Sequence, residues 1–496
     1  MDVRFVTEGR GDAVAVMATE GGHLLPAAQA LDAATNGRIA KSMAASRFTG
    51  GAGQVVDILA PDGVDFGRIL VIGVGAADRA DGLAVERWAG HAVKRTLASG
   101  ATKLVLQPDA LPGVAKSEAG THAGVGARLA AYRFDSYRTK LKPEQTPTLE
   151  EVQIAMEGPA AARARFDKDD AAVNGVYFAR DLVSEPANVL YPEEFARRIS
   201  ELSALGLEIE VLDPPAMEQL GMGALLGVGQ GSSHPPRLVT MSWKGARAKT
   251  RPIALVGKGV TFDTGGISIK PAAGMDEMKG DMGGAAAVCG AMKAIAERKA
   301  KANVVGVVAL VENMPGGNAQ RPGDIVKTMS GQTIEVLNTD AEGRLILADA
   351  VWYAQEKFKP SAIVDLATLT GAIIISLGHE FAGLFCNDED LAGALQSAGL
   401  SEGEPVWRMP IGPAYDKLID TPNADMKNIA GKPVAGSIVG AQFIKRFIKD
   451  GVAWAHIDIA GMAWKPGPYD DPTSPVWATG YGVRLLNRLV ANRYEE

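Results

Sequence analysis

Six ionisable side chains in the second half of the chain lie at the ends of apolar, strand-like segments or in the turns that follow them. They are Lys258, Asp263, Lys270, Asp281, Asp340 and Glu342. Carboxylates brought together in a cleft repel one another and resist the loss of their water, so such a group persists only where cations neutralise it. The pattern therefore predicts a metal site.

The four carboxylates of this group are enough for two hard or borderline divalent ions that share one bridging carboxylate, as in two-metal hydrolytic sites. Each residue also has a structural explanation. Lys258, between two glycines, fits a surface lysine in a tight turn, Asp263 fits an Asx-turn, and Asp281 fits a helix N-cap. A lysine is an unusual metal ligand, because its amine must be neutral to donate a lone pair.

Asp340 and Glu342 are two residues apart at the end of a predicted strand, 333–338. Residues i and i+2 of an extended strand point to the same side, which places two carboxylates at one point in space. Such a pair is costly without a cation. The alternative is a purely structural cluster, in which Arg344 rather than a metal ion neutralises the two carboxylates.

Histidine and cysteine do not supply a zinc site in this chain. The six histidines form no HExxH or HxH pattern, and the two cysteines have no CxxC spacing. We interpret Cys289 and Cys386 as inert core thiols. Any metal must therefore use oxygen ligands, with an amine as a further possibility.

Composition is that of a soluble globular protein, with 47% hydrophobic and 22% charged residues. No apolar stretch approaches the roughly 18–20 residues that span a bilayer, and the first ten residues do not resemble an export signal. We therefore expect a cytoplasmic protein without a membrane partner. The net charge of −7 argues against a general nucleic-acid binder.

At 496 residues the chain is too long for one ordinary core. Residues 68–75 and 103–106 fit buried strands on either side of a helical pattern, which predicts an N-terminal α/β domain over 1–159. Gly158-Pro159 breaks the pattern. We predict a linking helix over 160–184 and a larger C-terminal domain over 185–496.

In the larger domain, predicted strands alternate with helices. The strands are 208–212, 238–243, 253–256, 304–310, 334–337, 362–366 and 454–459. This alternation predicts a two-domain α/β fold in which the larger domain has a mostly parallel central sheet covered by helices on both faces. Ligands bind outside the carboxyl ends of such strands, where Lys258, Asp263 and Asp340 are expected.

At these residues the sequence resembles the leucyl aminopeptidase family, also called cytosol aminopeptidases. The resemblance is carried by VGKGVTFDTGGISIKP at 256–271, MDEMKGDMGGAAAV at 275–288 and NTDAEGRL at 338–345. Shorter matches lie at 179–183, 424–428 and 457–461. The likeness covers most of the chain from about residue 170, and the N-terminal domain matches more weakly.

The resemblance implies two divalent metal ions per subunit. Asp263, Asp340 and Glu342 hold the more exchangeable ion in this interpretation, with the backbone carbonyl of Asp340. Lys258, Asp263, Asp281 and Glu342 hold the tighter one, so Asp263 and Glu342 bridge. Zinc or manganese is expected, and magnesium or cobalt also suits oxygen ligands.

Lys270 and Arg344 match the two catalytic residues of the family that do not bind metal. The arginine there positions a bicarbonate ion, which acts as the general base. In this hypothesis, a bridging water would attack the scissile carbonyl, and Lys270 would donate a hydrogen bond to the developing oxyanion.

The same resemblance implies peptide substrates with a free N-terminus and a homohexamer. Met278, Thr368, Gly371 and Ala460 match positions that line the family's pocket for the first side chain. Because these residues are apolar or small, we expect leucine and other apolar residues to be preferred.

Two alternatives remain at this point. Carboxylate-bridged metals also suit a phosphoesterase, and some bacterial members of the family bind DNA. The DNA-binding candidates are Arg133, Arg138, Lys140 and Lys142, with Lys244, Arg247, Lys249 and Arg251 in an expected hairpin loop. We expect both basic groups to be solvated charged faces, so DNA binding is not favoured.

Overall fold

The computed structural model describes residues 1–465, 467 and 471–496. The chain divides into two compact units, the first formed by Met1–Val173 with Pro468–Pro475 and the second by Asn174–Gly467 with Val476–Glu496. Helix α5, Pro159–Ser184, contains the division between the two units. Among the described residues, no helix combines the length and the apolar character needed to span a bilayer.

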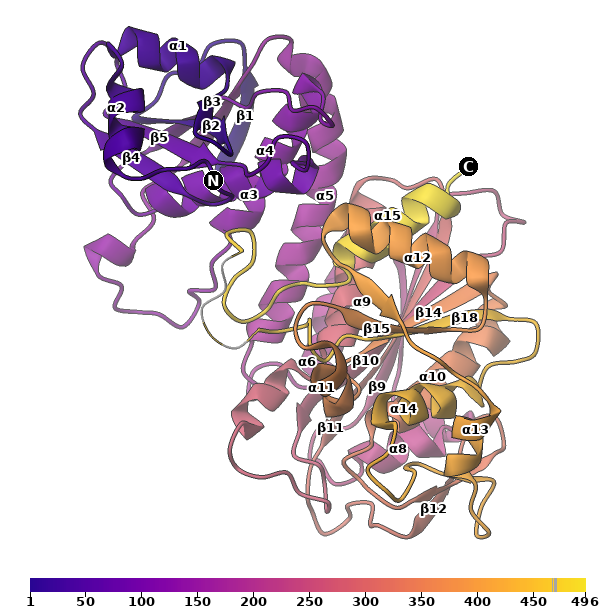
Figure 1. The fold of residues 1–496 in the computed structure, drawn as a ribbon. Helices are drawn as coiled ribbons and strands as arrows, with labels where there is room; N and C mark the ends of the chain where they lie inside the picture. The colour runs from indigo at the N-terminus through magenta and orange to yellow at the C-terminus, as the bar shows by residue number, and fades with distance from the viewer. Residues whose placement is uncertain (466, 468–470) are drawn as a thin grey trace. The chain divides into compact units, whose positions relative to one another are not determined.

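The first unit is built on a seven-stranded sheet, indigo to violet in Figure 1. Its strand order is β1-β7-β6-β2-β5-β4, and β3 pairs with β2. The strands are β1 (Asp2–Val6), β2 (Ala13–Thr19), β3 (His23–Leu24), β4 (Val55–Leu59), β5 (Arg68–Gly73), β6 (Lys103–Leu106) and β7 (Glu151–Ala155). The helices are α1 (Pro26–Ala34), α2 (Arg38–Ala45), α3 (Gly82–Thr96) and α4 (Lys116–Ala131), with the 3-10 turn η1 (Pro143–Gln145).

Helices cover both faces of this sheet because its central strands are apolar on both sides. In β2, Val14, Val16 and Ala18 share a core with Leu31 of α1 and Met43 of α2. The alternate residues of β2 are equally buried, and α3 packs against β2, β5 and β6. Strands buried on both faces are typical of parallel α/β sheets.

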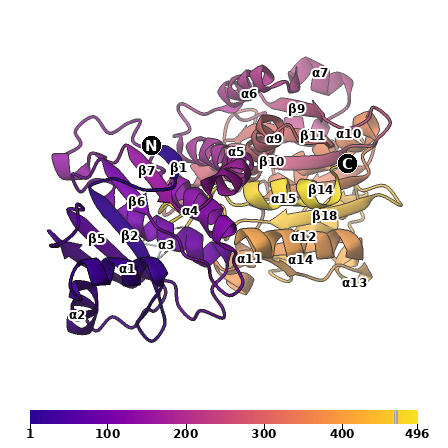
Figure 2. The same cartoon turned by 90° about the horizontal axis from the view of Figure 1, so that it is seen from above.

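The second unit has an eight-stranded central sheet in the order β16-β15-β18-β14-β10-β11-β9-β8. The strands are β8 (Glu208–Leu212), β9 (Arg237–Lys244), β10 (Ile253–Asp263), β11 (Asn303–Asn313), β14 (Ala362–Ala367), β15 (Ala382–Cys386), β16 (Val406–Arg408) and β18 (Ala453–Asp458). A smaller sheet joins β12 (Asp324–Lys327), β13 (Thr333–Val336) and β17 (Met426–Lys427). Figure 2 shows β9, β11, β10, β14 and β18 side by side.

Helices lie on both faces of the central sheet in this unit as well. The helices that follow α5 in this unit are α6 (Pro192–Ser200), α7 (Pro214–Gln219), α8 (Gly223–Gly229), α9 (Gly283–Glu297), α10 (Gly343–Phe358), α11 (Gly371–Leu377), α12 (Glu389–Glu402), α13 (Pro413–Asp416), α14 (Gly436–Lys445) and α15 (Val483–Arg493). The 3-10 turns are η2 (Glu201–Leu205), η3 (Met275–Gly280) and η4 (Lys417–Ile419). One core joins alternate residues of β10 and β11 to α8, α10 and α14, while α9 packs against β10, β11 and β14 outside that core. The predicted two-domain α/β fold with a mostly parallel sheet is confirmed.

Three local predictions were wrong. Strand β10 does not stop at Val256 but continues to Asp263, so Lys258 lies within a strand rather than in a turn. The flanking glycines allow close packing instead of a turn, because a Cβ at Gly257 would lie 2.6 Å from Cα of Ala285 in α9. The expected hairpin around Lys244 to Arg251 does not exist, since β9 pairs with β8 and β11 rather than with β10. The predicted strand 334–337 belongs to the small sheet.

A buried carboxylate near the start of α15 makes folding stability depend on pH. The Oε2 atom of Glu404 accepts a hydrogen bond from the backbone nitrogen of Leu485 at 2.7 Å. Burial raises the pKa of Glu404 to about 7. Because this folded-state pKa exceeds the unfolded value of about 4.3, the linked stabilisation is complete below pH ~4 and is lost as pH rises through ~7.

We therefore expect Glu404→Gln to gain stability relative to the unchanged protein as pH rises from 5 to 8.5, by about 1–3 kcal/mol in the free energy of unfolding. Denaturant titrations at both pH values measure this difference. Glu389→Gln is the control, since the Glu389 side chain is 89% exposed. A constant difference between Glu404→Gln and the unchanged protein at the two pH values would contradict the expectation.

Candidate metal and catalytic site

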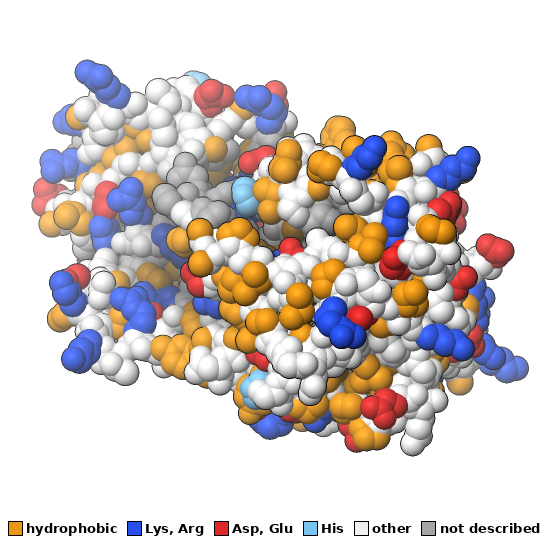
Figure 3. Space-filling model, turned by 90° about the horizontal axis from the view of Figure 1, so that it is seen from below, with side chains coloured by type: hydrophobic (Ala, Val, Ile, Leu, Met, Phe, Trp, Pro, Cys, Tyr) orange, Lys and Arg blue, Asp and Glu red, His pale blue; other side chains and the backbone are white. Residues whose placement is uncertain are grey.

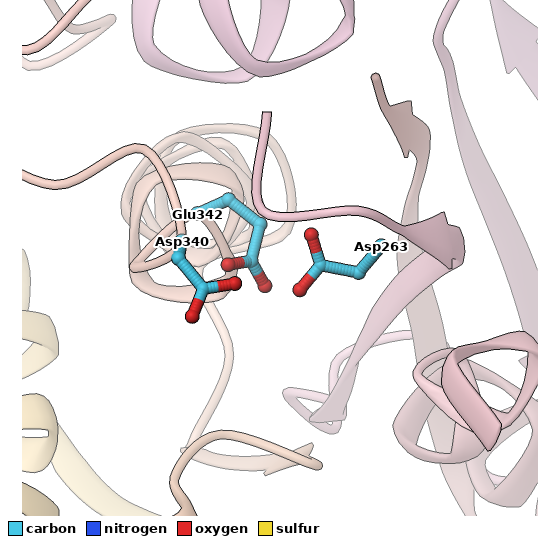
Figure 4. A group of neighbouring side chains, drawn as sticks. All are labelled: Asp263, Asp340 and Glu342. Carbon is cyan, nitrogen blue, oxygen red and sulfur yellow. The ribbon is translucent and has the colours of Figure 1, made fainter. Parts of the chain in front are cut away.

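Three carboxylates meet at the carboxyl end of β10. Asp263 is the last residue of that strand, Asp340 lies in the turn after β13, and Glu342 directly precedes α10. One oxygen from each lies within 4.8 Å of the others. Figure 4 shows the three carboxylates pointing toward one another. The expected convergence at strand ends is therefore present for these residues.

Lys258 lies fully buried between two acidic side chains. Its Nζ contacts Oδ1 of Asp281 at 2.9 Å and Oε1 of Glu342 at 2.8 Å, and it donates to the backbone oxygen of Thr368 at 2.7 Å. Burial alone lowers the pKa of Lys258, but the surrounding carboxylates outweigh it and raise that pKa above its ordinary value. The ammonium thus supplies positive charge inside the acidic cluster.

Lys270 supplies a second positive charge on the more open side. Its Nζ lies 2.8 Å from Oδ2 of Asp263 and also pairs with Oδ1 of Asp340. Burial opposes the charge, but Asp263 and its acidic neighbours raise the pKa of Lys270 above its ordinary value. About a fifth of the Lys270 side chain is exposed, which leaves the ammonium partly accessible.

The two lysines do not neutralise the whole cluster. Burial, followed by the charge of Glu342, raises the pKa of Asp263 to about 6. Burial, followed by the charge of Glu342, also raises the pKa of Asp281, to about 8. Burial also raises the pKa of Glu342, but Lys258 and Lys270 bring it below its ordinary value. Negative charge in this pocket is therefore under-compensated.

These residues fit divalent metal ions. The Oδ2 atom of Asp281 is buried and has no hydrogen-bond partner among the described residues, so a ligating oxygen is left over. Carboxylate oxygens suit hard and borderline cations, and added positive charge would also lower the pKa of Lys258 toward the neutral amine that can bind metal.

Arg344 is buried in the first turn of α10, two residues after Glu342 in the sequence. Its Nη1 donates to the backbone oxygen of Asn428 at 2.7 Å, and its Nε has no acceptor among the described residues. Burial lowers the pKa of Arg344 to about 10. The side chain borders a cavity of about 330 Å³ that is otherwise lined by residues 429–434, 436 and 439. This guanidinium therefore pairs with a backbone carbonyl and faces a space large enough for a small anion.

The predicted pocket residues come from different elements. Met278 lies half-buried in η3, Gly371 is the exposed first residue of α11, and Ala460 is buried just after β18. Thr368 is buried, and its Oγ1 donates to Oδ1 of Asp281 at 2.8 Å. Thr368 therefore holds a predicted metal ligand, a contact that the sequence did not indicate.

One structural explanation, for Asp281, and one geometric prediction, for Asp340 and Glu342, do not hold. Asp281 is not the N-cap of α9, because Met282 holds that position without a side-chain cap. Glu342 has helical dihedral angles, φ −82° and ψ −35°, so its carboxylate does not meet Asp340 through extended i, i+2 geometry. The carboxylates meet because the chain turns into α10 between them.

Sequence reasoning missed the neutral side chains that hold Asp263 and the backbone segments next to the carboxylates. Asn313 Nδ2 donates to Oδ1 of Asp263 at 2.7 Å, and Thr339 Oγ1 donates to the backbone oxygen of Gly265 at 2.6 Å. Asn428 Nδ2 donates to the backbone oxygen of Asn338 at 2.6 Å. Asn428 and Thr339 lie inside segments that resemble the family, and this resemblance could have indicated that they belong to the site. Asn313 lies outside them, at the end of an apolar strand.

The basic residues considered for DNA contact have acidic or backbone partners at several positions. Arg133 and Arg138 both pair with Asp135. Lys244 pairs with Glu208 at 2.6 Å, and Arg247 with Glu496 at 3.3 Å. On the face shown in Figure 3, lysines and arginines are scattered among apolar and uncharged groups.

Comparison with protein families gives two matches. Residues 177–487 match the catalytic domain of the cytosol aminopeptidase family, and residues 14–141 match the N-terminal domain of the same family. A Caulobacter vibrioides protein described as "Probable cytosol aminopeptidase" is 56% identical over 488 residues, 98% of this chain and 97% of its own length. A Rhodopseudomonas palustris protein with the same description is 53% identical, over 95% of this chain and 93% of its own length.

Solved structures give the same relationship. A variant of tomato leucine aminopeptidase matches with a TM-score of 0.90 and 33% identity, over 99% of this chain and 97% of its own. The bottromycin maturation enzyme BotP in complex with Mn matches with a TM-score of 0.85 and 34% identity, over 97% of this chain and 99% of its own. Both matches extend over nearly the whole chain, N-terminal unit included.

Proposed function

This chain belongs to the cytosol aminopeptidase family and is a metal-dependent aminopeptidase, and we propose that it holds two divalent ions through Lys258, Asp263, Asp281, Asp340 and Glu342. The observation that carries this proposal is the convergence of Asp263, Asp340 and Glu342 within 4.8 Å at one strand end. The buried, unpartnered oxygen of Asp281 supports it as a further ligand.

The contacts favour Asp263 and Glu342 as the ligands that the two ions share. Lys258 contacts both Glu342 and Asp281, whereas Lys270 contacts both Asp263 and Asp340. Asp263 and Glu342 also lie together in the group of three carboxylates, so the two lysine-linked pairs adjoin each other. Asp340 completes one ion's ligand set, and Lys258 with Asp281 completes the other.

Bound divalent ions supply the hydrolytic chemistry, by lowering the pKa of a water and by polarising the scissile carbonyl. Lys270 then has a distinct role in the proposal. Its ammonium is partly exposed at the edge of the cluster, where it donates a hydrogen bond to the oxyanion as charge develops. Arg344 would hold a bicarbonate ion in the cavity that this side chain borders, and the ion would supply a general base for the attacking water.

Substrates in this proposal are peptides with a free N-terminus, and leucine or another apolar first residue is preferred. The support is the apolar or small character of Met278, Thr368, Gly371 and Ala460. One methylene group in such a pocket discriminates by only about 1–3 kcal/mol. Related apolar residues should therefore also be released, at lower kcat/KM.

Metal identity, assembly and location extend the proposal. Manganese is supported by the BotP complex with Mn, and zinc, magnesium or cobalt suit the same oxygen ligands. We further propose a homohexamer in the cytoplasm, in line with the family resemblance.

Chelation with add-back tests the proposed function. We expect a chelator to abolish hydrolysis of a leucine chromogenic substrate, and Mn²⁺ or Zn²⁺ to restore it at two ions per chain, since the carboxylate cluster needs both. Metal analysis of each sample gives the stoichiometry. A matched phosphate ester chromogen is the control and should remain uncleaved. Full leucine release by metal-free protein would contradict the proposal.

A further inference from the structure

We propose that Asn313 is a positioning residue that presets the metal ligands Asp263 and Asp340 before any ion binds. This inference rests on the proposed ligand set. Asn313 is the last residue of β11, the neighbour of β10, and its side chain is buried. Its register partner across the two strands is Asp263.

The side-chain amide of Asn313 joins two separate ligand-bearing segments. Its Nδ2 donates to Oδ1 of Asp263 at 2.7 Å and to the backbone oxygen of Thr339 at 3.1 Å. Thr339 immediately precedes Asp340. Both partners are acceptors, so only the nitrogen of the amide can face them, and the orientation of the amide is fixed. One NH₂ group thus ties the end of β10 to the turn before α10.

This contact determines which oxygen of Asp263 is available. Oδ1 accepts from Asn313 and from the backbone nitrogen of Gly265 at 2.9 Å. Oδ2 is the atom that lies 2.8 Å from Nζ of Lys270. With Oδ1 held by two neutral donors, Oδ2 is directed toward the cationic side of the cluster.

A neutral amide suits this task better than the lysines do. Lys258 and Lys270 occupy the carboxylates with positive charge, which competes with an incoming cation. The amide of Asn313 adds no charge and approaches Asp263 from the side of β11, so its hydrogen bonds need not break when metal binds. Hydrogen bonds of this kind to ligating carboxylates typically change metal affinity by about 10–100-fold.

The backbone of the same residue strengthens the connection. The carbonyl oxygen of Asn313 accepts from the backbone nitrogen of Thr264 at 3.0 Å and from its Oγ1 at 2.8 Å. These bonds survive a side-chain substitution. Asn313→Ala should therefore loosen the ligands without releasing the loop that follows β10.

A matched control exists at the other end of the same strand. The amide of Asn303 donates to the backbone oxygens of Arg247 and Thr250 at 2.9 Å, and its Oδ1 accepts from the backbone nitrogen of Ala246. Asn303→Ala therefore removes a comparable set of hydrogen bonds from β11, far along the strand from the carboxylates.

The experiment titrates the full-length, chelator-treated protein with Co²⁺ and follows visible absorption, which reports affinity and ligand geometry. We expect Asn313→Ala to weaken Co²⁺ binding about 10–100-fold with an altered spectrum, while Asn303→Ala binds as the unchanged protein does. Asn313→Leu, which fills the space without a donor, should behave as Asn313→Ala does, and thermal unfolding identifies any variant that does not fold.

The outcomes separate this inference from the function on which it rests. Unchanged Co²⁺ affinity in a folded Asn313→Ala or Asn313→Leu protein would overturn the positioning role, and so would equal weakening in Asn303→Ala. Asp263→Ala serves as the ligand variant. If Asp263→Ala bound both Co²⁺ ions normally, the proposed ligand set itself would be wrong.

Discussion

Lys258→Met should destabilise the metal-free protein by about 3–5 kcal/mol at pH 8, the typical cost of removing one partner from a buried ion pair. The ammonium of Lys258 lies 2.9 Å from Asp281 and 2.8 Å from Glu342, and all three side chains are almost completely buried. Without it, two carboxylates face each other in a low-dielectric interior. The cost is the free energy of keeping them charged, or of protonating them.

The pH dependence of this cost has a definite sign. Removal of Lys258 raises the folded-state pKa values of both carboxylates, that of Asp281 from a value already above the unfolded one and that of Glu342 from a value below it. The folded variant therefore favours the protonated carboxylates, and its loss of stability relative to the unchanged protein shrinks toward pH 5. The loss grows as pH rises through about 8, which is the pKa of Asp281 in the unchanged protein. Denaturant titration of chelator-treated protein at pH 5 and pH 8 measures both effects.

Lys244→Met is the matched control for Lys258→Met. Lys244 pairs with Glu208 at 2.6 Å, but both side chains are about two-thirds exposed. Exposed pairs of this kind contribute about 0–1 kcal/mol. Equal losses in the two variants would show that the buried charge cluster has no special role in stability.

Lys270→Ala should lower kcat by about 10²–10³-fold while both metal ions stay bound, since removal of one oxyanion donor typically costs about 3–4 kcal/mol. The structure adds a reason for metal retention. The ammonium of Lys270 contacts Asp263 and Asp340, so its loss frees two proposed ligands rather than removing one. Metal affinity should be unchanged or higher.

Steady-state kinetics on a leucine chromogenic substrate, with metal analysis of the same sample, test this expectation. Lys142→Ala, at an exposed position in the first unit, is the control and should keep full kcat. If Lys270→Ala retained full kcat, the oxyanion role would be wrong. If it lost metal along with activity, Lys270 would act through the metal site instead.

Apolar patterning predicted most of the secondary structure of the larger unit. The predicted strand 362–366 corresponds to β14, Ala362–Ala367, and 304–310 lies within β11, Asn303–Asn313. The pattern failed at β10, where Lys258 and two glycines interrupt the apolar run that a strand usually shows. Only the packing of α9 against Gly257 and the carboxylates around Lys258 explain why a buried strand tolerates these residues.

The candidate site was predictable in its members but not in its contacts. Asp263 and Asp340 were expected together at one edge of the central sheet, but only Asp263 ends a strand of that sheet, since Asp340 follows β13 of the small sheet. The reason given for Glu342 was wrong, since the turn into α10, not extended geometry, brings it near. Asn313 carries no local signal, because an asparagine at a strand end is common and its partners lie 50 and 26 residues away.

The sequence by itself determined which groups are available: carboxylates and lysines in three motifs, at the boundaries of apolar segments that must be buried. Tertiary structure decided how these groups pair. Lys258 meets Asp281 and Thr368, 23 and 110 residues along the chain. Pairings of that kind depend on sheet order and on how far each strand extends, because hydrogen bonds act over a few ångströms in space and do not depend on separation along the chain.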